Sequence, residues 1–171
     1  MHERLDPEPF KVLEPARNVN YGREELPSPK DHRIRELLAA AASRATFTEV
    51  RDCLPPKADQ VLGAFAERAA SLAVRERSMD DLRTGLFAAA LAQAASADER
   101  DVLPALALLY RAAERIGAEP AVEFASAAER YGRGADSLAR FIRRAPEDRT
   151  PEAMGFEEVN DGKDFTFVCT W

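Results

Sequence analysis

Residues 79–117 read MDDLRTGLFAAALAQAASADERDVLPALALLYRAAERIG, and this stretch decides the fold. Its apolar residues recur at helical spacing on both sides of the polar turn Ser96-Ala97-Asp98, which predicts two helices joined as a hairpin. Most surface helices have one apolar stripe, but Gly85 to Ala92 and Val102 to Tyr110 are apolar on every side. We therefore expect this hairpin at the centre of the molecule, with other helices covering both of its faces.

The start of the second helix is open between two alternatives. If Ser96 caps it with Glu99 three residues later, Pro104 falls inside the helix and should kink it. If Asp101 is the cap, Pro104 falls in the first turn, where the missing N–H of proline costs nothing. The sequence does not decide between them.

Capping residues and apolar spacing predict further helices around the hairpin. Ser28 and Pro29 suit the cap and the first position of a helix, and Thr46 with Glu49 forms a capping box. A continuous apolar stripe from Val61 to Ala73 predicts a longer helix that covers one face of the hairpin. Further helix signals follow between Pro120 and Arg144.

Helix pairs therefore recur roughly every 40 residues, which is the spacing of HEAT-type helical repeats. We expect an all-α fold of about six to seven helices, arranged as a helical bundle or as a short HEAT-like stack. Residues 29–145 form the helical domain. An extended, proline-rich N-terminal arm (1–28) precedes it, and an acidic C-terminal segment (146–171) packs on it.

The C-terminal segment has the period of a strand. Its aromatic residues alternate with Thr166, Val168 and Thr170, and Asn160-Asp161-Gly162 is a hairpin turn signal. The alternation predicts a small β-hairpin or a single strand. It leaves open whether the aromatic side chains belong to the core or to an interface.

Charge and composition limit the classes of function. The net charge is −6, which argues against a nucleic-acid-binding protein. Residues 31–145 hold 17 acidic and 17 basic side chains, whereas residues 146–171 hold 7 and 2, so the excess of acid lies in the C-terminal segment. We expect no membrane span and a cytoplasmic protein in which Cys53 and Cys169 are free thiols.

The sequence contains no catalytic, metal-binding or nucleotide-binding motif. There are two histidines, His2 and His32, and the two cysteines stand far apart, which does not fit a zinc site. No phosphate loop or nucleophile elbow is present. We therefore expect no cofactor and no metal.

The preferred hypothesis is a non-enzymatic protein-interaction module, a helical scaffold or adaptor. An immunity or inhibitor protein that neutralises a basic partner is one form of it. The alternative is a small helical hydrolase or transferase that uses carboxylate and Arg side chains in an interhelical cleft. A pocket lined by carboxyl groups with raised pKa would favour the enzyme.

Two groups of residues are candidates for binding another protein. The first is the acidic and aromatic face of the C-terminal segment, made of Glu157, Glu158, Asp161, Asp164, Phe165, Phe167 and Trp171. The second lies at the end of the second hairpin helix, where Arg111 and Glu114 are three residues apart and can form an ion pair. With Tyr110 and Arg115, this pair would form the floor of a groove for the partner.

Overall fold

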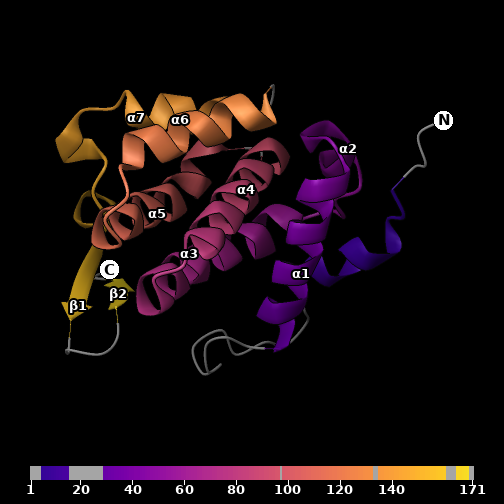
Figure 1. The fold of residues 1–171 in the computed structure, drawn as a ribbon, viewed down its shortest axis with the longest axis horizontal. Helices are drawn as coiled ribbons and strands as arrows, with labels where there is room; N and C mark the ends of the chain where they lie inside the picture. Colours follow the sequence, from indigo (N-terminus) through magenta and orange to yellow (C-terminus); the bar gives the residue numbers. More distant parts are fainter. Residues whose placement is uncertain (1–4, 16–28, 97, 133–134, 161–164, 170–171) are drawn as a thin grey trace.

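Helices dominate the described part of the chain, which comprises residues 5–15, 29–96, 98–132, 135–160 and 165–169 of a computed structural model (Figure 1). Within these residues there are seven α-helices, which confirms the predicted class and number. They are α1 (Pro29–Arg44), α2 (Phe47–Asp52), α3 (Ala58–Glu76), α4 (Met79–Ala95), α5 (Leu103–Arg115), α6 (Pro120–Tyr131) and α7 (Asp136–Ile142). Four short 3₁₀ helices are also present: η1 (Glu8–Leu13), η2 (Glu99–Val102), η3 (Pro146–Asp148) and η4 (Glu152–Met154).

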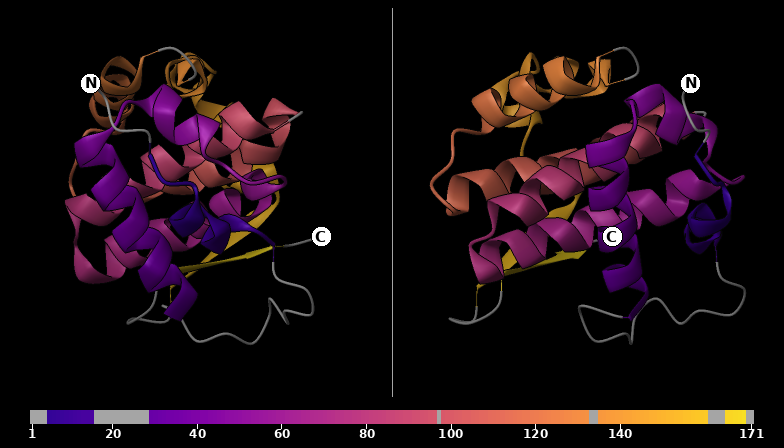
Figure 2. Two further views of the ribbon diagram at one scale, coloured as in Figure 1. Left: turned by 90° about the vertical axis from the view of Figure 1, so that its right-hand side faces the viewer. Right: turned by 45° about the vertical axis from the view of Figure 1, so that its right-hand side comes forward.

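The α4–α5 hairpin lies at the centre, as predicted. Helix α3 packs on both of its members from one side, and α6 and α7 pack on both from the other (Figures 1 and 2). Five consecutive residues of α4, Ala88 to Ala92, have no exposed surface, and Ala105 to Leu109 of α5 are each at most 4% exposed. The all-round apolar stretches therefore correspond to the buried layer.

The helices form a bundle around α4. This helix contacts α1, α2, α3, α5, α6 and α7. In a stack of repeats each helix pair contacts only its neighbours, so the packing is that of a bundle.

A close approach between α3, α4 and α5 depends on Gly85. A Cβ atom added there would lie 2.7 Å from the Cδ2 atom of Leu109 and 3.1 Å from the Cβ atom of Ala69. Both distances are shorter than ordinary van der Waals contact between carbon atoms. Gly85 therefore gives the room in which three helices meet.

Two aromatic clusters join the outer helices to the hairpin. Phe47, Phe87 and Tyr131 connect α2, α4 and α6, with ring centroids 4.8–6.1 Å apart. A second cluster connects α5, α6 and α7 through Tyr110, Phe124 and Phe141, with centroids 5.6–6.0 Å apart. These separations are those of favourable aromatic pairs.

Helix α1 is attached to the bundle by two buried carboxylates. Asp31 of α1 accepts from Arg68 of α3, whose Nη2 atom lies 2.6 Å from Oδ1. Arg35 of α1 in turn donates to Asp81 of α4 at 2.9 Å. Asp31 and Asp81 are each 2% exposed, so both carboxylates are shielded from water, whereas the Arg35 side chain is 40% exposed.

The N-terminal arm is not extended where the structure describes it. Residues 8–13 form η1, which buries Phe10 and Leu13 against the core. Two apolar residues three positions apart lie on one side of a 3₁₀ helix, and burying both outweighs the extended preference of the prolines.

Cys53, whose Sγ atom lies 3.9 Å from the Leu5 carbonyl oxygen, is a free thiol as predicted.

The second hairpin helix begins differently from either alternative. Asp98 caps the 3₁₀ turn η2 by accepting from the backbone N–H of Arg100, and α5 then begins at Leu103. Pro104 lies in the first turn of α5, where its missing N–H is harmless.

The C-terminal hairpin is present as predicted. Strand β1 (Phe156–Asn160) pairs antiparallel with β2 (Phe165–Cys169), with Glu158 opposite Phe167. The chain reaches β1 through η4 and Gly155, whose φ of +87° suits glycine. The two strands lie beneath α3 and α5 in Figure 1, on the side away from α6 and α7.

Candidate functional site

A cleft of about 370 Å³ lies where the end of α5 meets the C-terminal segment. We call it the C-terminal cleft. Residues from α5, the start of α6 and the 146–151 segment line it: Tyr110, Arg111, Glu114, Pro120, Pro146, Arg149, Thr150 and Pro151. It contains both residues of the second predicted group, Arg111 and Glu114.

Helix α5 brings three of these side chains to one place because of its period. Glu114 follows Tyr110 by four residues and Arg111 by three, so it is a neighbour of both on the surface of the helix. Farther towards the N-terminus the same helix is buried, so its last turns are where α5 turns from core to surface.

The ion pairs of Arg111 differ from the predicted one. Arg111 does not pair with Glu114 but with two acids of the C-terminal segment. Its Nη2 atom lies 3.0 Å from Oε2 of Glu152, and its Nη1 atom lies 2.8 Å from Oε2 of Glu158. The reason is that these two carboxylates cover the guanidinium group, so that the Arg111 side chain is only 15% exposed, whereas Glu114 remains at the surface.

Glu158 is bound on two sides. Arg115 donates to both of its carboxylate oxygens, at 2.9 Å from Nε and 2.6 Å from Nη2. Hydrogen bonds from Arg115 lower the pKa of Glu158, and Arg111 acts in the same direction. The same hydrogen bond raises the pKa of Arg115. Glu158, one of the predicted partner-binding acids, is thus engaged within the molecule.

Glu157, its neighbour on β1, is exposed. Side chains alternate between the two faces of a strand, so with Glu158 held against α5, Glu157 points away from it. Among the described residues it has no ion-pair partner. The predicted acidic face therefore divides between one acid that fixes β1 to α5 and one that faces solvent.

Arg149 forms part of the inner wall of the cleft. Its guanidinium carbon lies 5.1 Å from the centroid of the Tyr110 ring, and its Nη1 atom donates to the Ile142 carbonyl oxygen at 3.0 Å. Its Nε atom is buried and has no hydrogen-bond partner in the described part of the chain. Arg149 thereby holds the 146–151 segment against α5 and α7.

The other predicted residues are placed only in part. Phe165 and Phe167 belong to β2, where the backbone and the register are described. Asp161, Asp164 and Trp171 lie outside the described residues. The assignment of Phe165, Phe167 and Trp171 to a partner-binding face stays a prediction.

The surface around the cleft is acidic overall. Residues 110–115 and 146–158 hold six acids (Glu114, Glu147, Asp148, Glu152, Glu157 and Glu158) and three arginines (Arg111, Arg115 and Arg149), a net charge of −3. Three of the acids, Glu114, Glu147 and Asp148, are exposed without an ion-pair partner among the described residues. Glu114 lines the cleft, and Glu147 and Asp148 lie in the chain between Pro146 and Arg149, which line it. We call these three the acidic rim.

Sequence reasoning missed Arg149 and Glu152. Neither belongs to a motif, and the partners of Glu152 and Glu158 are more than 40 residues away along the chain. The signal that was available was local: three acids and one arginine among residues 147–152.

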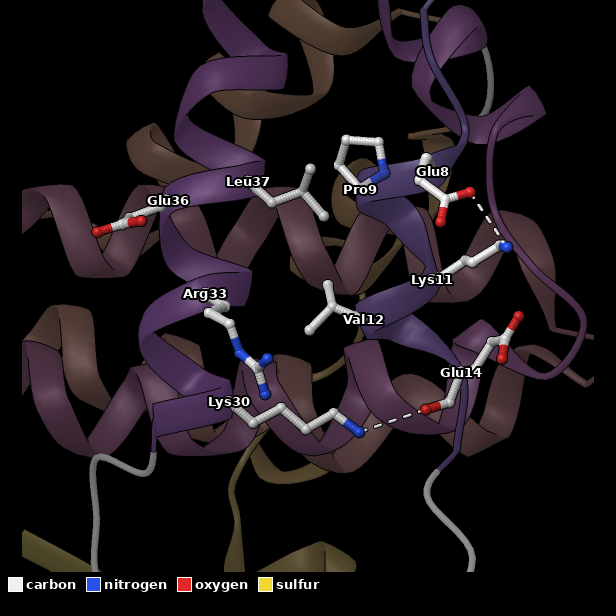
Figure 3. A pocket seen from close by; sticks show the side chains of 9 residues that line it. All are labelled: Glu8, Pro9, Lys11, Val12, Glu14, Lys30, Arg33, Glu36 and Leu37. Atoms are coloured by element: carbon white, nitrogen blue, oxygen red, sulfur yellow. Dashed lines mark hydrogen bonds and ion pairs between the residues drawn. The ribbon is translucent and has the colours of Figure 1, made fainter.

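A larger cavity, of about 760 Å³, lies between η1 and α1 (Figure 3). Its apolar wall is made of Pro9, Val12 and Leu37. Three acids and three bases surround it: Glu8, Glu14, Glu36, Lys11, Lys30 and Arg33. Because these charges cancel, the cavity has no net negative charge that would attract a basic partner. We therefore take the C-terminal cleft as the candidate site.

Comparison of the chain with protein-family models, with curated proteins and with solved structures gave no match. Within the described residues no group of three or more His, Cys, Asp or Glu side chains is placed to hold a metal ion. None of the described helices has the length and apolarity that crossing a bilayer requires.

Proposed function

We propose that this chain is a protein-interaction module that binds a basic partner at the C-terminal cleft and its acidic rim. One observation carries the proposal: the acids of this region divide into two sets. Glu152 and Glu158 are bound by Arg111 and Arg115 and fix the segment in place. The acidic rim and Glu157 have no ion-pair partner in the described part of the chain and face outwards.

This division suits recognition because the scaffold is preorganised. The side chains that shape the cleft are held by packing and ion pairs, so little conformational entropy is lost when a partner binds. The free carboxylates attract a basic surface and speed its approach, an effect that salt weakens. The exposed parts of Tyr110, Pro120 and Pro146 offer apolar contact beside them.

An immunity or inhibitor protein is a specific form of this proposal. Such a protein covers the basic substrate-binding surface of an enzyme, and an acidic surface on a rigid helical body fits that task. It rests on the same acids and predicts in addition that the partner loses its activity when bound.

The enzyme alternative receives less support. Burial raises the pKa of Glu67 and of Asp81, the type of perturbed carboxyl group expected in a catalytic site. Neither residue lines the C-terminal cleft. Asp81 is instead held by Arg35 between two helices, which is a structural position.

The test is capture of the partner from the native host with the full chain, followed by binding measurements with the purified pair. A variant that we call the rim variant removes the three acids of the acidic rim together with Glu157: Glu114→Gln, Glu147→Gln, Asp148→Asn and Glu157→Gln. We expect it to weaken association at least about tenfold in low salt, with most of the loss in the association rate and a flatter salt dependence. Glu158 is left unchanged in this variant because it holds β1.

A matched control removes four exposed acids elsewhere: Glu36→Gln, Glu76→Gln, Glu129→Gln and Asp136→Asn. Both variants change the net charge equally, so a specific site requires that the control bind much as the parent does. If both variants lost affinity equally, the effect would come from overall charge and not from a specific site. Unchanged binding by the rim variant would refute the proposed surface.

A further inference from the structure

One cation of the C-terminal cleft has no acidic partner. Arg111 is balanced by Glu152 and Glu158. Arg149, by contrast, forms no ion pair in the part of the chain that the structure describes, where its contacts are an aromatic ring and a carbonyl oxygen. Its Nη2 atom has no hydrogen-bond partner among the described residues and, unlike its Nε atom, is not buried. Arg149 therefore offers an accessible donor on the wall of the cleft.

Tyr110 offers a second donor beside it. The guanidinium carbon of Arg149 lies 5.1 Å from the centroid of the Tyr110 ring, and both residues line the cleft. The Tyr110 hydroxyl is not buried, and it has no hydrogen-bond partner within the residues that the structure describes. Phenol and guanidinium groups both donate hydrogen bonds to carboxylates. Two neighbouring donors are thus available to one acceptor in the cleft.

The acids around the cleft limit what this acceptor can be. The surrounding surface, residues 110–115 and 146–158, has a net charge of −3 and repels a free small anion. A carboxylate that belongs to a basic chain is attracted instead, because the lysines or arginines of that chain meet the acidic rim. The acceptor is therefore assigned to the basic partner, and this inference rests on the proposed function.

The size of the cleft favours the end of a chain over an acidic side chain. A volume of about 370 Å³ is more than two carboxylate oxygens fill, and it lies within the roughly 300–1,000 Å³ of small-ligand pockets. Pro120, Pro146 and Pro151 also line the cleft and offer it apolar surface. A C-terminal residue carries its carboxylate and its side chain on one Cα atom, so an apolar last residue suits both parts at once.

We propose that the C-terminal cleft binds the C-terminal residue of the basic partner. The terminal carboxylate accepts from Nη2 of Arg149 and from the Tyr110 hydroxyl, and the last side chain packs on the prolines. Basic residues that precede it meet the acidic rim. Capture of a C-terminal carboxylate is a recurring mode of peptide recognition. The partner is thereby specified as a protein that ends in a basic segment with an apolar last residue.

Three short peptides test this with the full chain, by calorimetry and NMR. The first, the free-acid peptide, is N-acetylated Lys-Lys-Lys-Leu, and the second, the amide peptide, has the same sequence with a C-terminal amide. The third, the glutamate peptide, is N-acetylated Lys-Lys-Lys-Glu amide, which has the charge of the first but carries its carboxylate on a side chain. We expect the free-acid peptide to bind with a Kd of about 1 mM or below, and at least about tenfold more tightly than the other two.

General attraction predicts the opposite order for the first two peptides. The amide peptide has one more positive charge, so an acidic surface alone would bind it more tightly. Binding of the amide peptide as tightly as the free-acid peptide would therefore overturn the proposal, as would the absence of saturation by about 10 mM of the free-acid peptide. Equally tight binding of the glutamate peptide would overturn the assignment to a chain end.

Three variants distinguish the two donors from the charge of the region. Arg149→Gln and Tyr110→Phe should weaken binding of the free-acid peptide by about tenfold and about threefold, without weakening that of the amide peptide. Tyr110→Phe keeps the ring on which Arg149 lies, so it removes a donor without releasing the 146–151 segment. If it weakened both peptides equally, the hydroxyl would have no role in binding the carboxylate, and the proposal would fail.

Arg143→Gln is the matched control for Arg149→Gln. Arg143 is exposed and does not line the cleft, and its substitution removes the same charge. Binding of the free-acid peptide should therefore be close to that of the parent. If Arg143→Gln weakens it as much as Arg149→Gln does, charge alone is at work and the cleft holds no carboxylate site.

The rim variant separates this inference from the proposed function. The acids that it removes attract the lysines, so it should weaken the free-acid and amide peptides alike. If it does so while the parent binds both peptides equally, the proposed function stands and the chain-end inference fails. If the rim variant binds both peptides as the parent does, the acidic rim does not attract basic chains and the proposed function itself fails.

Discussion

The α4–α5 hairpin and the C-terminal segment are held in the protein by different forces. The hairpin is enclosed by apolar side chains, and much of its length is buried alanine and leucine. The C-terminal segment has Pro151 as its one buried residue among positions 146–158, and is attached through Arg111, Arg115 and Arg149. The hairpin should therefore be sensitive to polar or oversized side chains in its core, and the segment to the loss of its ion pairs.

The largest effect is expected from a charge placed in the hairpin. Leu106 of α5 is 1% exposed, and Leu106→Asp would bury a carboxylate with no cationic partner. We expect a loss of at least about 4 kcal/mol in the free energy of unfolding, a large part of the roughly 5–15 kcal/mol that is typical of a single domain. Val122→Asp is the matched control, because Val122 of α6 is 54% exposed and should tolerate the change within about 0.5 kcal/mol. Urea unfolding measures both, and similar midpoints would mean that α5 is not central.

A change of volume alone comes next. Gly85→Leu would place a side chain where even a Cβ atom lies 3.1 Å from that of Ala69, and should cost about 2–3 kcal/mol. Gly63→Ala, in α3, has no heavy atom within 4 Å of the added Cβ and should stabilise by about 0.5–1 kcal/mol through helix propensity. Thermal unfolding compares them. Stabilisation by both substitutions would show that the helices do not meet closely at Gly85.

The two regions also differ in how well sequence reasoning anticipates them. The hairpin was predictable because its evidence is local: the helical period and the polar turn lie within the stretch that folds, although the first residue of the second helix was not predicted. Thr46 caps α2 by accepting from the N–H of Glu49, as the capping box predicts, and Ser78 caps α4 in the same way by accepting from that of Asp81.

The sequence predicted some residues of the candidate site but not their interaction partners. Arg111 and Glu114 were expected at the end of a buried helix, and they do line a cleft. The spacing rule for ion pairs chose Glu114 as the partner of Arg111, but two acids more than 40 residues away took that place. Local spacing cannot reveal a partner that tertiary folding supplies.

Breaking the attachment of the C-terminal segment should have a smaller, local effect. Arg111→Met leaves Glu152 and Glu158 without their shared cation, and should cost about 1–2 kcal/mol in the stability of the segment. Hydrogen exchange should show faster exchange in β1 and β2 while α4 stays protected. Arg115→Met should do less, because its side chain is 47% exposed and its pair is partly screened by water. A cooperative loss of protection in α4 as well would show that the segment and the hairpin unfold as one unit.

The smallest effect separates the regions by the sign of their pH dependence. Arg115 and Arg111 lower the pKa of Glu158 from its ordinary value of 4.5, so its ion pairs stabilise the fold above that pH. This stabilisation is lost as the pH falls through the lower pKa of the folded state.

Asp81, in the core, behaves oppositely, because burial raises its pKa from 3.8. Its charged form carries a penalty at neutral pH that protonation relieves. The parent should therefore have a higher free energy of unfolding than Glu158→Gln, and this difference should shrink as the pH falls below about 4.5. Compared with Asp81→Asn, the free energy of unfolding of the parent should rise as the pH falls from neutrality towards 3.8. Urea unfolding at a series of pH values measures both differences, and slopes of the same sign would contradict the division between a core stabilised by burial and a segment attached by charge.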